Sequence, residues 1–169
     1  MKVPDRKLRA DRMVFYARDI DLLDGELDGF LEYSGAKAAL LIDREGHLVT
    51  RRGEPVAGSM DSLSALIAGS FAATKEMARL LGEEEFSSLV HQGDRQSVQL
   101  LLIGQRTILA IVWDERTNLG LVRFYAQETA KRLEQAFFEI GTRPIDETQN
   151  EGLGDDYSKE ATAALDDLF

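Results

Sequence analysis

The sequence contains no cysteine, only three prolines and only two histidines among 169 residues. The absence of cysteine excludes disulfides, thiolate nucleophiles and zinc sites that need thiolate ligands. Neither His47 nor His91 has a second histidine four residues away, so surface or structural roles are favoured over metal binding. Phosphate-binding motifs of the P-loop and G-x-G-x-x-G types are also missing. We therefore expect no catalytic residue, no metal site and no cofactor.

The chain lacks a basic excess, with 20 basic against 30 acidic residues and a net charge of -10. Residues 141–169 alone hold eight acidic and two basic residues. This balance argues against nucleic acid or an anionic membrane as the partner. Long apolar runs are also missing, because segments such as 38–42 and 100–103 are far shorter than the roughly 20 residues that span a bilayer. With no apolar signal core at the charged N-terminus, we expect a soluble cytoplasmic protein without membrane insertion.

Apolar periodicity predicts three helices, and short apolar runs between turn residues predict five strands. The short loops between the last three strands indicate antiparallel neighbours. The predicted fold is therefore an α+β sandwich of order α-β-β-α-β-β-β-α, with a five-stranded antiparallel sheet, one central helix and flanking terminal helices. The expected helices are 20–34, 63–81 and 119–140, and the expected strands are 37–42, 48–50, 86–91, 96–103 and 107–113.

Composition divides the chain into four parts. Residues 1–13 form a basic extension, and residues 14–140 carry the periodic elements of one domain. Residues 141–156 lose periodicity and gain charge, which predicts an acidic linker. In residues 157–169, apolar side chains return at helical spacing, and these are Tyr157, Ala161, Ala164, Leu165, Leu168 and Phe169. A frayed terminus is one interpretation of this segment, but a short helix that docks on a partner explains its apolar anchors better.

The helix over residues 63–81 is unusual in its small side chains. Asp61 or Ser62 is expected to cap it and Gly82 to end it. The side expected to face the sheet carries Leu63, Leu66, Ile67, Ser70, Met77 and Leu81. The remaining circumference carries Ala65, Ala68, Gly69, Ala72 and Ala73, framed by Lys75, Glu76 and Arg79. Such small residues either favour helix formation or let another backbone approach closely, and composition alone leaves both interpretations open.

Several segments resemble the roadblock and dynein light chain family, in particular its MglB-like branch. The most similar stretch, Asp114 to Arg123, reads Asp-Glu-Arg-Thr-Asn-Leu-Gly-Leu-Val-Arg. There the family shows an acidic residue, Arg-Thr, a small polar residue and Leu-Gly-Leu-Val-Arg. The terminal Asp-Asp-Leu-Phe resembles the family's C-terminal helix motif. Further similar segments are 14–16, 36–43, 62–69 and 80–86, so that the resemblance covers roughly residues 14–140 and the last four.

The resemblance implies a homodimer in which the second helices pair and the third strands join edge to edge. The paired helices would form a platform for a GTP-loaded Ras-like small GTPase of the MglA type, with two subunits to one GTPase. Activation in the family reshapes the GTPase's own switch segments without an inserted arginine, so this chain would not itself be an enzyme. The docking helix, with Tyr157, Leu165, Leu168 and Phe169, would bind a second place on the GTPase. The alternative is a roadblock scaffold or adaptor that binds without activating.

Overall fold

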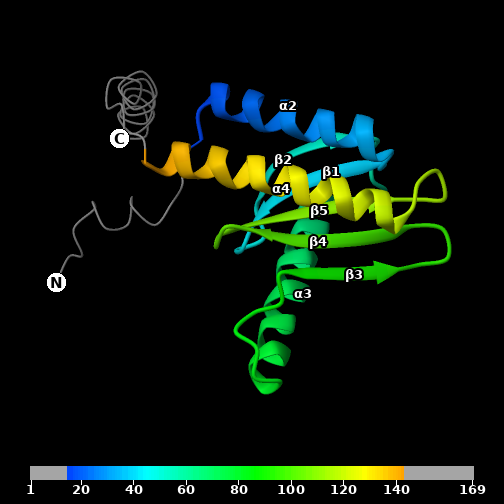
Figure 1. The fold of residues 1–169 in the computed structure, drawn as a ribbon, viewed down its shortest axis with the longest axis vertical. Coiled ribbons are helices and arrows are strands. Elements are labelled where there is room, and N and C mark those ends of the chain that lie inside the picture. The colour runs from blue at the N-terminus through cyan, green and yellow to red at the C-terminus, as the bar shows by residue number, and fades with distance from the viewer. Residues whose placement is uncertain (1–14, 143–169) are drawn as a thin grey trace, which may run out of the picture.

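The computed structural model describes residues 15–142, which form three helices and five strands (Figure 1). Their order is the predicted α-β-β-α-β-β-β-α. The elements are α2 (Ala17–Ser34), β1 (Ala38–Asp43), β2 (Leu48–Gly53), α3 (Met60–Leu80), β3 (Ser88–Gln92), β4 (Ser97–Ile103), β5 (Thr107–Trp113) and α4 (Leu119–Thr142). Within these residues, no helix combines the length and the apolar character that crossing a membrane requires.

The five strands form one antiparallel sheet in the order β2-β1-β5-β4-β3. All seven residues of β5 are buried, and five of the six residues of β1 are buried. This explains their nearly continuous apolar sequences, because a central strand covered on both faces has no polar side. β3 is an edge strand that pairs only with β4 among the described residues. It is the shortest strand and is largely exposed.

Helices cover both faces of the sheet (Figure 1). α2 and α4 lie side by side on one face, where Leu27 and Leu133 pack with Leu109 of β5. α3 lies on the other face, where Phe71 packs with Leu40 and other strand residues. Alternate residues of each central strand enter the two cores, as the period of two in a strand requires. The single central helix and the two flanking terminal helices are thus confirmed.

Capping contacts explain where α2 and α3 begin and where α2 ends. α2 begins where the backbone N–H of Tyr16 donates to the carboxylate of Asp19 at 2.8 Å, and it ends at Gly35, whose φ of 70° is left-handed. α3 begins one turn earlier than predicted. Its N-cap is Ser59, whose side chain accepts from the N–H of Ser62 at 3.3 Å, so the expected cap at Asp61 or Ser62 was wrong. Because α3 already begins at Met60, Ser59 is the residue whose side chain can accept from an N–H of the first turn.

Candidate functional site

The inner side of α3 differs from the one that its hydrophobicity predicted. The buried residues are Ser64, Ile67, Ala68, Phe71, Thr74 and Ala78. Leu66, Met77 and Leu81, expected to face the sheet, are instead 71%, 51% and 73% exposed. The prediction failed because α3 has apolar residues around most of its circumference, so periodicity alone does not fix its rotation. The bulky Ile67 and Phe71 set the buried side.

The outer side of α3 carries both small and large apolar residues. Ala65, Gly69, Ala72 and Ala73 are exposed there, in keeping with their predicted position away from the sheet. Leu66, Gly69, Ala73, Met77 and Leu80 recur in steps of three or four, which places them in one stripe along the helix. Leu80 is 77% exposed. Small residues in such a stripe let a second helix approach closely between the larger side chains.

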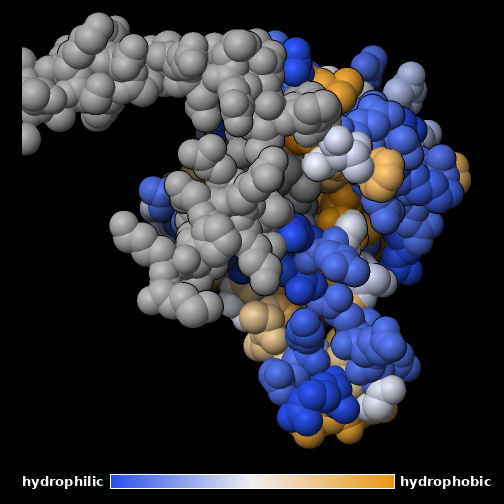
Figure 2. All heavy atoms as spheres, turned by 90° about the vertical axis from the view of Figure 1, so that its left-hand side faces the viewer, coloured by the Kyte–Doolittle hydropathy of each residue, from blue (hydrophilic) through white to orange (hydrophobic). Residues whose placement is uncertain are grey.

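The C-terminal part of α3 extends past the sheet, beyond β3 (Figure 1). The view turned by 90° shows the same projection, with apolar residues gathered at its end (Figure 2). An apolar surface at the end of a projecting helix is accessible to another molecule from several directions. Large exposed apolar patches are typical of interaction sites.

Lys75, Glu76 and Arg79, which were predicted to frame the small residues, are all exposed. Arg79 donates to Glu76 at 3.0 Å, a pair within the helix that contributes little in water. Ala68 differs from the other predicted platform residues because it is only 7% exposed and lies against the sheet. A large substitution at Ala68 therefore tests folding, whereas one at Ala72 or Ala73 tests the surface. The predicted docking residues Tyr157, Leu165, Leu168 and Phe169 lie outside the described residues.

The segment that most resembles the family, residues 114–123, forms the connection from β5 into α4, and the side chains at its start hold three elements together. Arg116 donates to Asp114 at 2.9 Å and to Glu54, just after β2, at 2.7 Å. These hydrogen bonds lower the pKa of Glu54 and Asp114 and raise that of Arg116. Thr117 donates to the carbonyl of Ser34 at 2.6 Å, at the end of α2.

The next residue of that segment starts α4, where the Asn118 side chain accepts from the N–H of Leu121 at 3.0 Å. The motif therefore has a structural explanation in this chain. It fixes the ends of α2, β2 and α4, on the opposite side of the sheet from α3. Sequence reasoning did not find its partners Glu54 and Ser34, which are 62 and 83 residues away along the chain.

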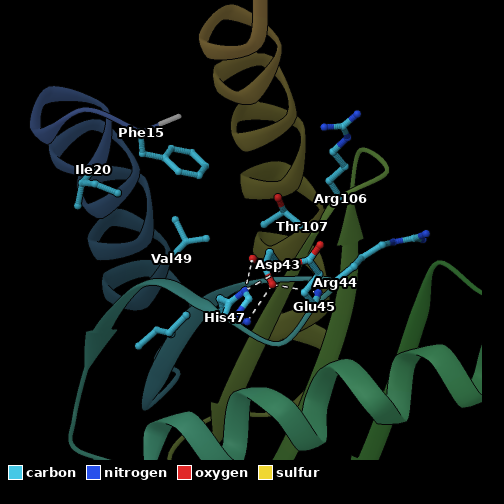
Figure 3. A pocket seen from close by; sticks show the side chains of 10 residues that line it. Phe15, Ile20, Asp43, Arg44, Glu45, His47, Val49, Arg106 and Thr107 are labelled. Atoms are coloured by element: carbon cyan, nitrogen blue, oxygen red, sulfur yellow. Dashed lines mark hydrogen bonds and ion pairs between the residues drawn. The ribbon is translucent and has the colours of Figure 1, made fainter. Parts of the chain in front are cut away.

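A pocket of about 790 Å³ opens between α2, the β1–β2 hairpin and the β4–β5 turn (Figure 3). Side-chain oxygens of Asp43 and Glu45 and a ring nitrogen of His47 lie within 4.8 Å of one another at this hairpin. Asp43 accepts from the N–H groups of Glu45 and His47 at 3.0 and 2.8 Å, and its second oxygen lies 3.1 Å from Nδ1 of His47. These contacts close the turn, which gives the carboxylate a structural role.

The order of the elements and the five-stranded antiparallel sheet are those of the Roadblock/LC7 family. A family profile described as the Roadblock/LC7 domain matches residues 23–112, and the chain belongs to this family. More particularly, it is an MglB-like member, because the solved structures that it matches include three MglB proteins at 31% to 33% identity. The comparison with curated proteins gives no significant match.

The MglB structures match most of the chain. "MglB with tetrameric arrangement" is 33% identical with a TM-score of 0.72, and the match covers 76% of this chain and 96% of that one. Gliding protein MglB from Thermus thermophilus is 33% identical with a TM-score of 0.71, and the match covers 75% of this chain and 96% of that one. Myxococcus xanthus MglB is 31% identical with a TM-score of 0.67, and the match covers 70% and 96%.

Proposed function

We propose that this protein is a cytoplasmic homodimer that binds a Ras-like small GTPase of the MglA type and stimulates its GTP hydrolysis, in the control of cell polarity or motility. The observation that carries the proposal is the apolar outer face of α3, which nothing in residues 15–142 covers. The similarity to MglB proteins supports the choice of partner. No membrane insertion and no nucleic acid take part.

The homodimer uses two neighbouring features of one subunit. The stripe from Leu66 to Leu80 on α3 packs against the same stripe of a second copy, where Gly69 and Ala73 allow close approach. The unpaired edge of β3 then joins the β3 edge of the partner subunit. An unpaired edge strand beside an exposed apolar helix would otherwise favour aggregation. One symmetric contact covers both the β3 edge and the α3 stripe.

The GTPase sits on the platform formed by the two α3 helices. Ala65 and Ala72 contribute its exposed surface, Gly69 and Ala73 form the seam where the two helices meet, Ala68 supports it from beneath, and Lys75, Glu76 and Arg79 border it. The C-terminal anchors Tyr157, Leu165, Leu168 and Phe169 bind elsewhere on the GTPase and raise its local concentration. The chain supplies no catalytic residue, because stimulation acts through the switch segments of the GTPase itself.

Phosphate release from the GTP-loaded GTPase, measured with and without this protein, tests the proposal. The wild-type chain should raise the rate, and Ala73→Arg should abolish the increase because a long charged side chain prevents close packing on the α3 face. Gln127→Arg on the exposed side of α4 is the matched control and should retain full stimulation. If the wild-type chain binds the GTPase but leaves the rate of phosphate release unchanged, the protein is a scaffold or adaptor. If Ala73→Arg stimulates as strongly as Gln127→Arg, α3 is not part of the binding site.

A further inference from the structure

The outer surface of α2 is strongly acidic. Five carboxylates of the helix are at least partly exposed, namely Asp21, Asp24, Glu26, Asp28 and Glu32, as is one cation, Arg18, while Asp19 is buried at the helix start. Two arginines from other elements neutralise part of this charge, since Arg52 binds Asp28 at 2.8 Å and Arg132 binds Glu26 at 2.7 Å. Asp21 and Glu32 are exposed and have no ion pair within residues 15–142. A surplus of negative charge therefore remains on this face.

The acidic residues lie beside an apolar stripe on the same helix. At 100° per residue, Asp21, Asp28 and Glu32 share the flank toward β2, where Arg52 lies. Leu22 and Tyr33, 49% and 68% exposed, share the flank toward α4, where Tyr33 stacks on Tyr125 with ring centroids 5.8 Å apart. The exposed surface thus offers a row of carboxylates beside a row of apolar groups.

Two glycines lie between these rows. Gly25 and Gly29 leave the helix surface without side chains, and a Cβ at either position would meet no atom within 4 Å. A glycine in a helix interior costs about 0.5 to 1 kcal/mol relative to alanine, and packing within the described chain gives no reason for either one. Their absent side chains leave a strip of bare helix backbone, called the path below, where a peptide can approach closely between the carboxylates and the apolar groups.

Charge decides which segment fits this path. A second copy that presented its own α2 would bring the same negative charges together. Residues 141–169 carry a net charge of -6 and would be repelled as well. Residues 1–14 carry five basic and two acidic residues, with Val3, Leu8 and Met13 as apolar groups among them. Only this segment of the chain complements both rows of the path.

The position and length of that segment also suit the path. The segment joins the described chain at Phe15, two residues before α2 begins at Ala17. Fourteen residues reach up to about 46 Å when extended, whereas the 18 residues of α2 span about 27 Å. We infer that residues 1–14 turn back and dock along the outer face of α2 in the same chain, with their cations at Asp21 and Glu32. This inference does not depend on the GTPase.

Paramagnetic relaxation in the full-length protein tests the docking. Because the chain has no cysteine, Ala10→Cys places a nitroxide label at one position only. Amide signals of Gly25 and Gly29 should broaden, while Gly69 on α3, on the opposite layer, serves as the internal reference and should not. Raising the salt to about 0.5 M should remove most of the broadening, because the screening length falls below about 5 Å. Equal effects at all three glycines would overturn the inference.

Two matched charge reversals decide whether the face itself is recognised. Asp21→Lys with Glu32→Lys should reduce the relaxation enhancement at Gly25 and Gly29 at least about threefold, since it turns attraction into repulsion. Glu83→Lys with Glu134→Lys changes the net charge by the same amount at exposed acids away from α2, and should leave the enhancement unchanged. If both pairs act equally, only bulk charge matters and the docking site is wrong. Broadening seen only between labelled and isotope-enriched chains in a mixed sample would overturn docking within one chain.

Discussion

The two helical layers of this small domain are built differently. Three long-range arginine contacts connect the α2 and α4 side, linking Arg132 to Glu26, Arg52 to Asp28 and Arg116 to Glu54. On the α3 side, the one ion pair among the described residues of the helix is internal, between Glu76 and Arg79. The α2 and α4 layer is thus held by contacts within the chain. Both layers leave large apolar side chains exposed, among them Phe124 and Phe138 of α4 and Leu66 and Leu80 of α3. On α3 they lie in one stripe on a helix with no ion pair to another described element, which is the arrangement expected where a second molecule completes the packing.

The same substitution in the two layers gives the largest contrast. Leu133→Ala removes a side chain of α4 that is fully buried, and should lower the free energy of unfolding by about 2 to 5 kcal/mol. Leu80→Ala removes an exposed side chain of α3 and should cost the single chain less than about 0.5 kcal/mol. Urea unfolding followed by circular dichroism measures both.

Protein concentration separates folding from assembly in that comparison. In a dimer held by α3, the unfolding midpoint of the wild-type chain rises with protein concentration, and Leu80→Ala should weaken this dependence. Leu133→Ala should leave the dependence in place. If Leu80→Ala destabilised the chain as strongly as Leu133→Ala at every concentration, α3 would be part of a core and not an interface.

The sequence predicted the elements better than their orientation. The strands 96–103 and 107–113 were predicted almost to the residue, because turn residues bound both runs. The outer face of α3 was assigned incorrectly at Leu66, Met77 and Leu81, because a helix that is apolar on two sides has no single periodic solution. β3 begins two residues later than predicted, since the edge of a sheet gives only one side of pairing to define it.

The contacts of the β5–α4 connection were beyond sequence reasoning for another reason. Arg116 and Thr117 were recognised only as part of a similar segment. Their partners Glu54 and Ser34 come close only after the sheet has formed, and no local pattern records a contact across 62 or 83 residues. The resemblance indicated that the segment matters, and the structure supplies a reason in the ends of three elements.

A partner held by the α3 layer alone would not need the C-terminal segment. We expect deletion of residues 157–169 to lower the affinity for the GTP-loaded GTPase by about threefold to tenfold, because a tethered second contact acts at high effective concentration. The melting temperature and the dimer should change little, because a segment of this length is marginal as an isolated helix. Titration of the full-length and the truncated protein with the GTP-loaded GTPase measures the two affinities. Equal affinities, or a truncated chain that does not fold, would contradict the docking helix.

A smaller effect is expected in the layer that is held from within. Thr117→Val keeps the shape of the side chain but removes the 2.6 Å hydrogen bond to the carbonyl of Ser34. The cost should be about 0.5 to 1.5 kcal/mol, the usual net contribution of such a bond. Thr142→Val is a matched control, because its hydroxyl also donates to backbone carbonyls but is exposed at the end of α4. If the two variants were destabilised equally, the hydrogen bond from Thr117 would contribute no more to stability than an exposed one at a helix end.

The smallest effect concerns the pH dependence of the Arg116 contacts. Hydrogen bonds from Arg116 lower the pKa of Glu54 and Asp114 below their ordinary values of 4.5 and 3.8. A carboxylate with a lowered folded-state pKa stabilises the fold above its unfolded pKa, and this contribution is lost as the pH falls through the folded-state value.

The pKa of Arg116 is raised, so its own contribution is present throughout this range and would be lost only in strong alkali. Arg116 and Glu54 are exposed and Asp114 is partly exposed, so Arg116→Gln should lower the melting temperature at neutral pH by no more than about 2 °C. The difference from the wild-type chain should shrink as the pH falls through the lowered folded-state pKa values of the two carboxylates. Arg79→Gln, which breaks only a pair within α3, should give a still smaller difference at neutral pH. Melting curves of the three proteins between pH 3 and 7 measure this, and a difference for Arg116→Gln that grew on acidification would contradict the assigned pairing.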